Sequence, residues 1–154
     1  MNSRVVRPAA KPRTTIARQS GPRIVRSWAS LTGAQVIKLR ELPKEMLEDD
    51  FQSVVLTAAL HHGWMAVHFR RALQKSGRYS TPVQGMKGSP DLTLARDGVV
   101  LLAELKTNTG ALRPEQRQWR QHLGNSWRLW RPRDWADILT ELETGEPPRK
   151  EGTA

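Results

Sequence analysis

The chain has 154 residues, enough for one modest domain with an extension and a buried core. It has no cysteine, so disulfides and thiolate metal sites are excluded, and no apolar run approaches the ~20 residues of a membrane helix. The N-terminus lacks the apolar segment of a secretory signal, and we expect a cytoplasmic protein.

The formal net charge of +10 is concentrated at one end of the chain. Residues 1–40 contain nine Lys or Arg and no acid, whereas the remainder holds sixteen basic and fifteen acidic residues. Such asymmetry favours a polyanionic partner, most simply DNA, although a solubilising tail would have the same composition.

Residues 1–43 are predicted to form a basic, largely disordered arm. Prolines and scattered arginines without apolar periodicity dominate its first part. Residues 24–43 contain short apolar pieces and Trp28, which are compatible with a short strand or helix docked on the domain. Pro43 marks the expected boundary, because proline disfavours helical geometry at the residue before it.

The predicted domain spans residues 44–143. It begins with a helix from Lys44 to about His62, whose apolar residues recur at three- and four-residue steps. A strand over residues 64–69 follows, and then residues 70–89 as a long loop, which in a compact domain is more often functional than idle.

Two apolar, β-prone runs then flank Asp97-Gly98, a strong signal for a two-residue hairpin turn. Both faces of this hairpin are mostly apolar, which predicts strands covered on two sides. A helix over residues 114–123 with proline in its first turn, a strand over 127–131 and a helix over 134–142 complete the domain. Residues 144–154 are expected to be a disordered tail. The order αβββαβ(α) predicts an α/β fold with a mixed four-stranded sheet between helices.

The hairpin register brings three charged residues together. With residues 97 and 98 as the loop, Asp91 lies directly across from Glu104 on one face, with Cβ atoms roughly 5 Å apart. Lys106 follows two residues later and shares that face. Mg²⁺ is bound by one or two carboxylates with water and substrate phosphate, so this spacing fits a metal site. The alternative is an exposed cross-strand ion network, which buried strands disfavour.

These residues resemble a known signature. Gly88-Ser-Pro-Asp91, twelve residues, and then Glu104-Leu-Lys106 are similar to the signature of the PD-(D/E)xK nuclease superfamily. The flanking Glu48-Asp-Asp-Phe-Gln52, Gly63-Trp64 with His68, and Pro114-Glu-Gln116 narrow the resemblance to the VRR-Nuc group, including its small stand-alone, often phage-encoded members.

The resemblance implies a restriction-endonuclease-like core and hydrolysis of a DNA phosphodiester, on branched, flap or junction DNA in related domains. Asp91, Glu104 and the carbonyl of Leu105 would bind Mg²⁺ or Mn²⁺. Lys106 would position the attacking water, and Gln116 would contact a water or the phosphate. Glu48 would point into the site, directly or through water, although Asp49 and Asp50 are adjacent candidates.

Basic residues of the long loop flank the predicted site, and we expect them to contact DNA phosphates without reading sequence. A protein with one site needs a homodimer or two encounters to cut both strands, so a homodimer is an expected form. A restriction- or repair-type nuclease, or a non-catalytic nucleic-acid-binding protein on the same fold, are the alternatives. The expected phosphate contacts are Arg70, Arg71, Lys75, Arg78 and Lys87.

Overall fold

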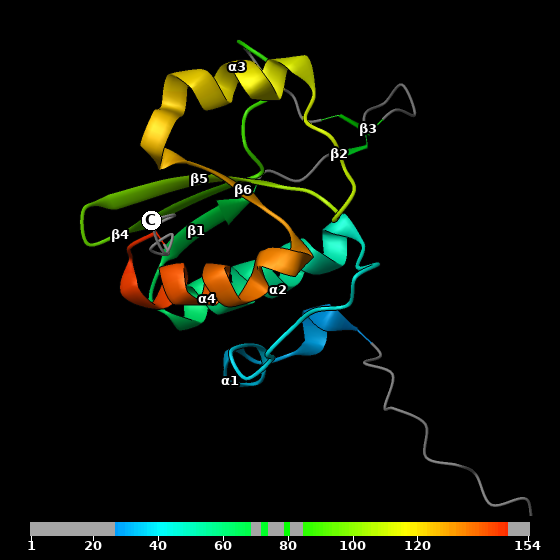
Figure 1. The fold of residues 1–154 in the computed structure, drawn as a ribbon, viewed down its shortest axis with the longest axis vertical. Coiled ribbons are helices and arrows are strands. Elements are labelled where there is room, and N and C mark those ends of the chain that lie inside the picture. The colour runs from blue at the N-terminus through cyan, green and yellow to red at the C-terminus, as the bar shows by residue number, and fades with distance from the viewer. Residues whose placement is uncertain (1–26, 69–71, 74–78, 81–84, 148–154) are drawn as a thin grey trace, which may run out of the picture.

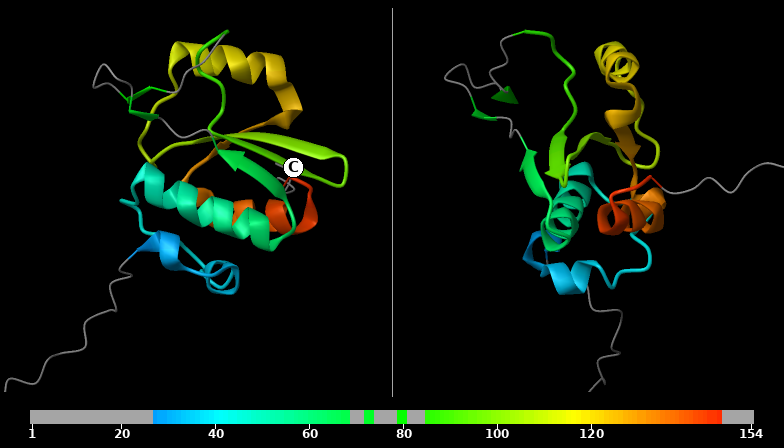
Figure 2. Two further views of the ribbon diagram at one scale, coloured as in Figure 1. Left: turned by 180° about the vertical axis from the view of Figure 1, so that it is seen from behind. Right: turned by 90° about the vertical axis from the view of Figure 1, so that its left-hand side faces the viewer.

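A four-stranded sheet lies between helices in this mixed α/β protein. The computed structural model describes residues 27–68, 72–73, 79–80 and 85–147. The sheet has the order β1-β4-β5-β6, with β5 and β6 parallel and the other pairs antiparallel. Figures 1 and 2 show α2 and α4 against one face of the sheet and α3 beyond the other. The strands are β1 (Met65–His68), β4 (Leu92–Arg96), β5 (Val99–Leu105) and β6 (Trp127–Trp130), and the long helices are α2 (Glu48–His61), α3 (Pro114–Leu123) and α4 (Trp135–Thr144).

The β4–β5 hairpin has the predicted register. Leu92 pairs with Ala103 and Arg96 with Val99, so Asp97 and Gly98 form the two-residue loop. Both loop residues have positive φ, 50° and 80°, as a turn compatible with strand twist requires. Because β4 begins one residue after Asp91, the same register carries Asp91 opposite Glu104.

The core fills the sheet face that α2 and α4 cover. The five side chains that the hairpin contributes to the core have at most 2% of their surface exposed, and α2 and α4 contribute a matching apolar stripe. Helix α2 begins four residues later than predicted, because Leu47 is extended and serves as its N-cap. The hairpin contributes Leu92, Leu94, Leu101, Ala103 and Leu105, α2 contributes Phe51, Val54, Val55, Ala58 and Ala59, and α4 contributes Trp135, Ile138 and Leu142.

The prediction that both faces of the hairpin are covered is wrong for the face that bears Glu104. Thr93, Ala95 and Leu102 are only half-buried there, and Val100 is 47% exposed. Helix α3 packs beside β6 and offers few apolar side chains, so it leaves much of this face open.

Residues 27–43 pack on the domain. They contain η1 (Trp28–Ser30) and α1 (Gly33–Val36), which is the kind of short docked element that the sequence allows. Val36 is fully buried, Leu42 is 7% exposed, and Trp135 Nε1 donates a hydrogen bond to the carbonyl of Leu39 at 3.0 Å. The disordered arm therefore remains a prediction for residues 1–26 alone, which lie outside the described residues.

The segment predicted as one long loop contains a second, two-stranded sheet. β2 (Ala72–Leu73) pairs antiparallel with β3 (Tyr79–Ser80). The residues between and beside these strands lie outside the described part of the chain. No helix among the described residues is long and apolar enough to span a bilayer.

Candidate metal-binding and catalytic site

Asp91 and Glu104 face each other at the end of the sheet where β4 begins and β5 ends. The backbone N–H of Leu105 donates a hydrogen bond of 2.8 Å to Oδ2 of Asp91. This bond ties the residue before β4 to the last residue of β5. The two carboxylates are therefore held by the backbone pairing of the hairpin, as the register predicts.

Glu104 is a buried carboxylate whose two oxygens differ in their hydrogen bonding. Only 1% of the residue is exposed. Its Oε1 accepts hydrogen bonds from Nζ of Lys106 and Nε2 of Gln116. Its Oε2 is buried and has no hydrogen-bond partner among the described residues. A buried acceptor without a donor is costly, so this oxygen is the natural place for a cation or a water.

Lys106 joins three groups at the strand end. Besides Glu104, its Nζ donates to the carbonyl of Leu105 at 3.0 Å and lies 3.8 Å from Oε1 of Glu48. The Lys106 side chain is 12% exposed, whereas that of Glu48 is 45% exposed. The first turn of α2 thus brings Glu48 to the cluster, and among the three candidate acids this is the one with a contact to Lys106.

Gln116 enters the site from the first turn of α3. Its Oε1 accepts a hydrogen bond of 2.9 Å from the backbone N–H of Arg113, which caps the helix, while its amide nitrogen donates to Glu104. Pro114 opens the helix with the φ angle that a first turn needs. Gln116 therefore holds Glu104 directly in this structure, and its expected contact with a water or phosphate stays a prediction.

The pKa of Glu104 is raised to about 7, chiefly by burial and then by the neighbouring Asp91 and Glu48 carboxylates, against the opposing effect of Lys106. Near neutral pH this carboxyl group is thus divided between its neutral and ionised forms. A divalent cation beside it would favour the ionised form, so metal binding and proton release are linked.

The donor set fits a hard divalent cation that keeps part of its water shell. The described residues include no group of three or more histidine, aspartate or glutamate side chains arranged to hold a metal alone. Two facing carboxylates, with Oε2 of Glu104 unpaired, are nevertheless a normal protein contribution to Mg²⁺. The Leu105 carbonyl and Glu48 both contact Lys106, and their roles as ligands stay predictions.

No family model, curated protein or solved structure matches the chain.

Gln52 and His68 form a contact that the sequence interpretation missed. The amide nitrogen of Gln52 lies 2.8 Å from Nδ1 of His68. Gln52 follows Glu48 by one helical turn, and His68 pairs with Leu92 beside Asp91, so both flank the cluster. The sequence signal for this contact is that Gln52 follows Glu48 by four residues, so that both lie on one face of the helix.

Lys87 is exposed, and its carbonyl accepts a hydrogen bond of 2.9 Å from Nε1 of Trp119. Trp119 is half-buried against this segment and is not one of the core residues. Trp127 and Trp130 are 8% and 4% exposed, so they pack and do not form a base-stacking surface. The other basic residues predicted to contact DNA lie outside the described residues. They are Arg70, Arg71, Lys75 and Arg78.

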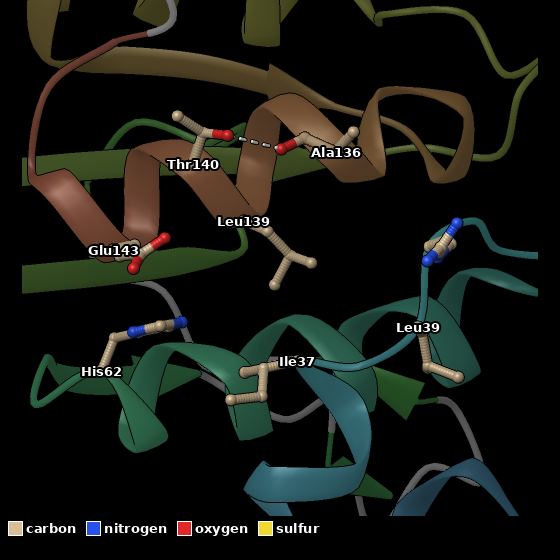
Figure 3. Close-up of a pocket in the computed structure, with 8 residues that line it drawn as sticks. Ile37, Leu39, His62, Ala136, Leu139, Thr140 and Glu143 are labelled. Atoms are coloured by element: carbon tan, nitrogen blue, oxygen red, sulfur yellow. Dashed lines mark hydrogen bonds between the residues drawn. The ribbon is translucent and has the colours of Figure 1, made fainter.

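A pocket of about 490 Å³ lies elsewhere, between α4 and the segment after α1 (Figure 3). Ile37 and Leu139 line it with His62 and Glu143, and none of its residues belongs to the carboxylate cluster. Burial, and then the neighbouring His61, lowers the pKa of His62. The pocket thus combines apolar groups with the His62 imidazole and the single carboxylate of Glu143, and it has no carboxylate pair.

Proposed function

We propose that this chain is a metal-dependent DNA endonuclease that hydrolyses phosphodiester bonds at the cluster of Asp91, Glu104 and Lys106. One observation carries the proposal. A buried carboxylate, Glu104, faces a second carboxylate and keeps one oxygen unpaired, while a lysine and a glutamine hold the other. A purely structural ion pair would not need a second acid beside it.

We infer membership of the PD-(D/E)xK superfamily and its VRR-Nuc group, with a restriction-endonuclease-like core. The chain order α2, β1, β4, β5, α3, β6 and α4 supports this, with β2 and β3 as an insertion. The gathering of the motif residues at one end of the sheet, between the first turns of α2 and α3, also supports the inference.

The residues divide the chemistry between them. A bound Mg²⁺ or Mn²⁺ would polarise a phosphoryl oxygen and make hydroxide available near neutral pH. Asp91 and Glu104 would hold that cation through their carboxylate oxygens. Lys106 would orient the attacking water and offset the negative charge that develops at phosphorus. Gln116, which donates to Glu104, would act as a positioning residue, and Glu48, beside Lys106, would either position the lysine or bind the cation.

The substrate that we propose is branched, flap or junction DNA, with the basic arm of residues 1–26 adding salt-sensitive affinity. A restriction- or repair-type nuclease with the same cluster is the alternative substrate class. A non-catalytic DNA-binding protein is the alternative outside enzymes, and the presence of all three cluster residues argues against it. A homodimer would bring two such sites to one substrate.

A cleavage assay tests the proposal. Duplex, flap and four-way-junction DNA are incubated with the protein in Mg²⁺, Mn²⁺ or EDTA, and Asp91→Asn and Lys106→Ala are compared with the exposed controls Asp137→Asn and Lys38→Ala. We expect cutting that requires metal, is lost in the two cluster variants and survives in the controls. Unchanged cutting in both cluster variants would refute the site. Binding without any cutting by the wild type would favour the non-catalytic alternative.

A further inference from the structure

Helix α3 has an unusually polar surface for a helix beside a sheet. Of its ten residues only Gln116 is buried, and that side chain is committed to Glu104. Trp119 and Leu123 are half-buried, and the other seven residues of the helix are exposed. The outward surface of α3 is therefore open to a partner.

Three arginines share one flank of this helix. Arg113, the N-cap of the helix, is followed by Arg117 and Arg120 at spacings of four and three residues, which places them on the same side, and all three are exposed. We call these three residues the arginine ridge. At 1.5 Å of rise per residue, the ridge extends roughly 10 Å along the helix axis.

The only acid of α3 lies on its other flank. A Cβ added at Gly88 would come within 2.6 Å of Cβ of Glu115, so the segment before Asp91 packs against that side of the helix. No other acid occurs between residues 113 and 124. In the described part of the chain, no ion pair joins the ridge to a carboxylate. The ridge thus presents uncompensated positive charge.

The ridge is also fixed relative to the site. The guanidinium of Arg120 lies 5.3 Å from the ring centre of Trp127, a stacking distance that limits its motion. Gln116 on the same helix donates to Glu104. A ligand bound along the ridge would therefore have a defined position relative to the two carboxylates.

We propose that the arginine ridge binds the sugar–phosphate backbone of the DNA on which the site acts, an inference that rests on the proposed nuclease function. One strand of B-DNA carries a phosphate about every 3.4 Å along the axis, so a ridge of roughly 10 Å spans about three phosphates. Arginine suits this contact, because its planar fork donates two parallel hydrogen bonds to phosphate oxygens. Such contacts position the duplex without reading its sequence.

Two charge-matched double variants of the full chain test the ridge. Arg117→Gln/Arg120→Gln removes two ridge charges, and Lys38→Gln/Arg40→Gln removes two exposed charges just after α1, which lies on the far side of α2 from α3 (Figures 1 and 2). Fluorescence anisotropy with a labelled 30-base-pair duplex in EDTA, at several salt concentrations, measures binding without cleavage. Thermal unfolding confirms that each variant is folded.

The ridge double variant should bind on the order of tenfold more weakly, and its plot of log affinity against log salt should be shallower by about 1.8, the value for two lost phosphate contacts. The control should change far less, and Arg117→Lys/Arg120→Lys should retain most of the affinity. Equal losses in both double variants, or no loss in the ridge variant, would overturn the proposal.

Cleavage in Mg²⁺ separates this proposal from the function on which it rests. If the wild type cuts DNA and the ridge variant binds and cuts equally well, the role of the ridge is refuted and the nuclease function stands. If DNA binding depends on the ridge but the wild type does not cut, the role of the ridge stands and the nuclease function is refuted.

Discussion

Gln116 donates a hydrogen bond to Glu104, joining the first turn of α3 to the end of β5 across twelve residues of chain. Both side chains are nearly inaccessible, with 2% and 1% of their surfaces exposed. A buried glutamine is not retained there by apolar packing. Its two hydrogen bonds, to Glu104 and from Arg113, fix the carboxylate and the helix start together.

Replacing Gln116 with alanine should lower both the affinity for metal and the stability of the fold. The change removes a donor from Glu104 and leaves the Arg113 N–H without its acceptor, at a cost of roughly 1–3 kcal/mol in the free energy of unfolding. Loss of a residue that orients a ligand typically lowers metal affinity ten- to a hundredfold. Isothermal titration with Mn²⁺ measures this, with the exposed Gln118→Ala as control. Equal affinities in both variants would contradict the positioning role.

Stability without metal should fall as pH rises through the titration of Glu104. The group has a pKa of about 7 in the folded protein against 4.5 when exposed. Between these values the folded state holds a proton that the unfolded chain has released, so the free energy of unfolding decreases with pH, by up to roughly 3 kcal/mol. Urea unfolding in EDTA from pH 5 to pH 8 measures the slope.

Glu104→Gln isolates the contribution of this carboxyl group to the slope. The variant should lack the decrease between pH 5 and pH 8, whereas the exposed Glu115→Gln should retain it. Mg²⁺ should stabilise the wild type more at pH 8 than at pH 5, because it favours the ionised carboxylate. A slope identical in both variants would show that other groups cause the pH dependence.

Gly88→Ala should disturb the contact between α3 and the segment that leads to Asp91. Gly88 has φ of 86°, and an added Cβ would lie 2.6 Å from Cβ of Glu115 and 2.9 Å from its carbonyl carbon. Gly98→Ala is the matched control, since its φ is 80° but no atom lies within 4 Å of the added Cβ.

The control isolates backbone strain, which costs about 1 kcal/mol. The Gly88 variant should lose more stability, and it should also bind Mn²⁺ more weakly, because Asp91 would shift. Thermal unfolding and metal titration of the two variants provide the comparison, and equal stability losses would argue against a tight contact with α3.

Arg96, the last residue of β4, should contribute strongly to stability, since its side chain is only 16% exposed. Its guanidinium donates to the carbonyls of His62, Leu142 and Glu143 at 2.7–3.0 Å and lies 4.7 Å from the ring centre of Trp64. It thus satisfies the carbonyl ends of both α2 and α4.

Arg96→Met should lower the free energy of unfolding by about 2–4 kcal/mol, measured by urea denaturation, because several acceptors lose a charged donor at once. Asp97→Asn removes only the 3.6 Å ion pair with Arg96, and the Asp97 side chain is 90% exposed. This variant should therefore change stability by less than about 0.5 kcal/mol. Similar losses in the two variants would refute this role of Arg96.

The hairpin and its paired acids could be predicted from the sequence alone. Asp97-Gly98 specifies the turn, and the period of two along each strand then fixes which side chains face one another. The opposition of Asp91 and Glu104 follows from counting residues. The helix over residues 114–123 was predicted equally well, because Pro114 and Gly124 mark its ends locally.

The tertiary structure decided what surrounds that pair. Only packing shows that Glu48 reaches Lys106, that Gln116 holds Glu104, and that one oxygen of Glu104 lacks a donor. It also shows that the second face of the hairpin is partly open, although most of its strand residues are apolar. Local patterns specify a strand and its two faces, but the depth to which each face is buried depends on helices distant in the sequence.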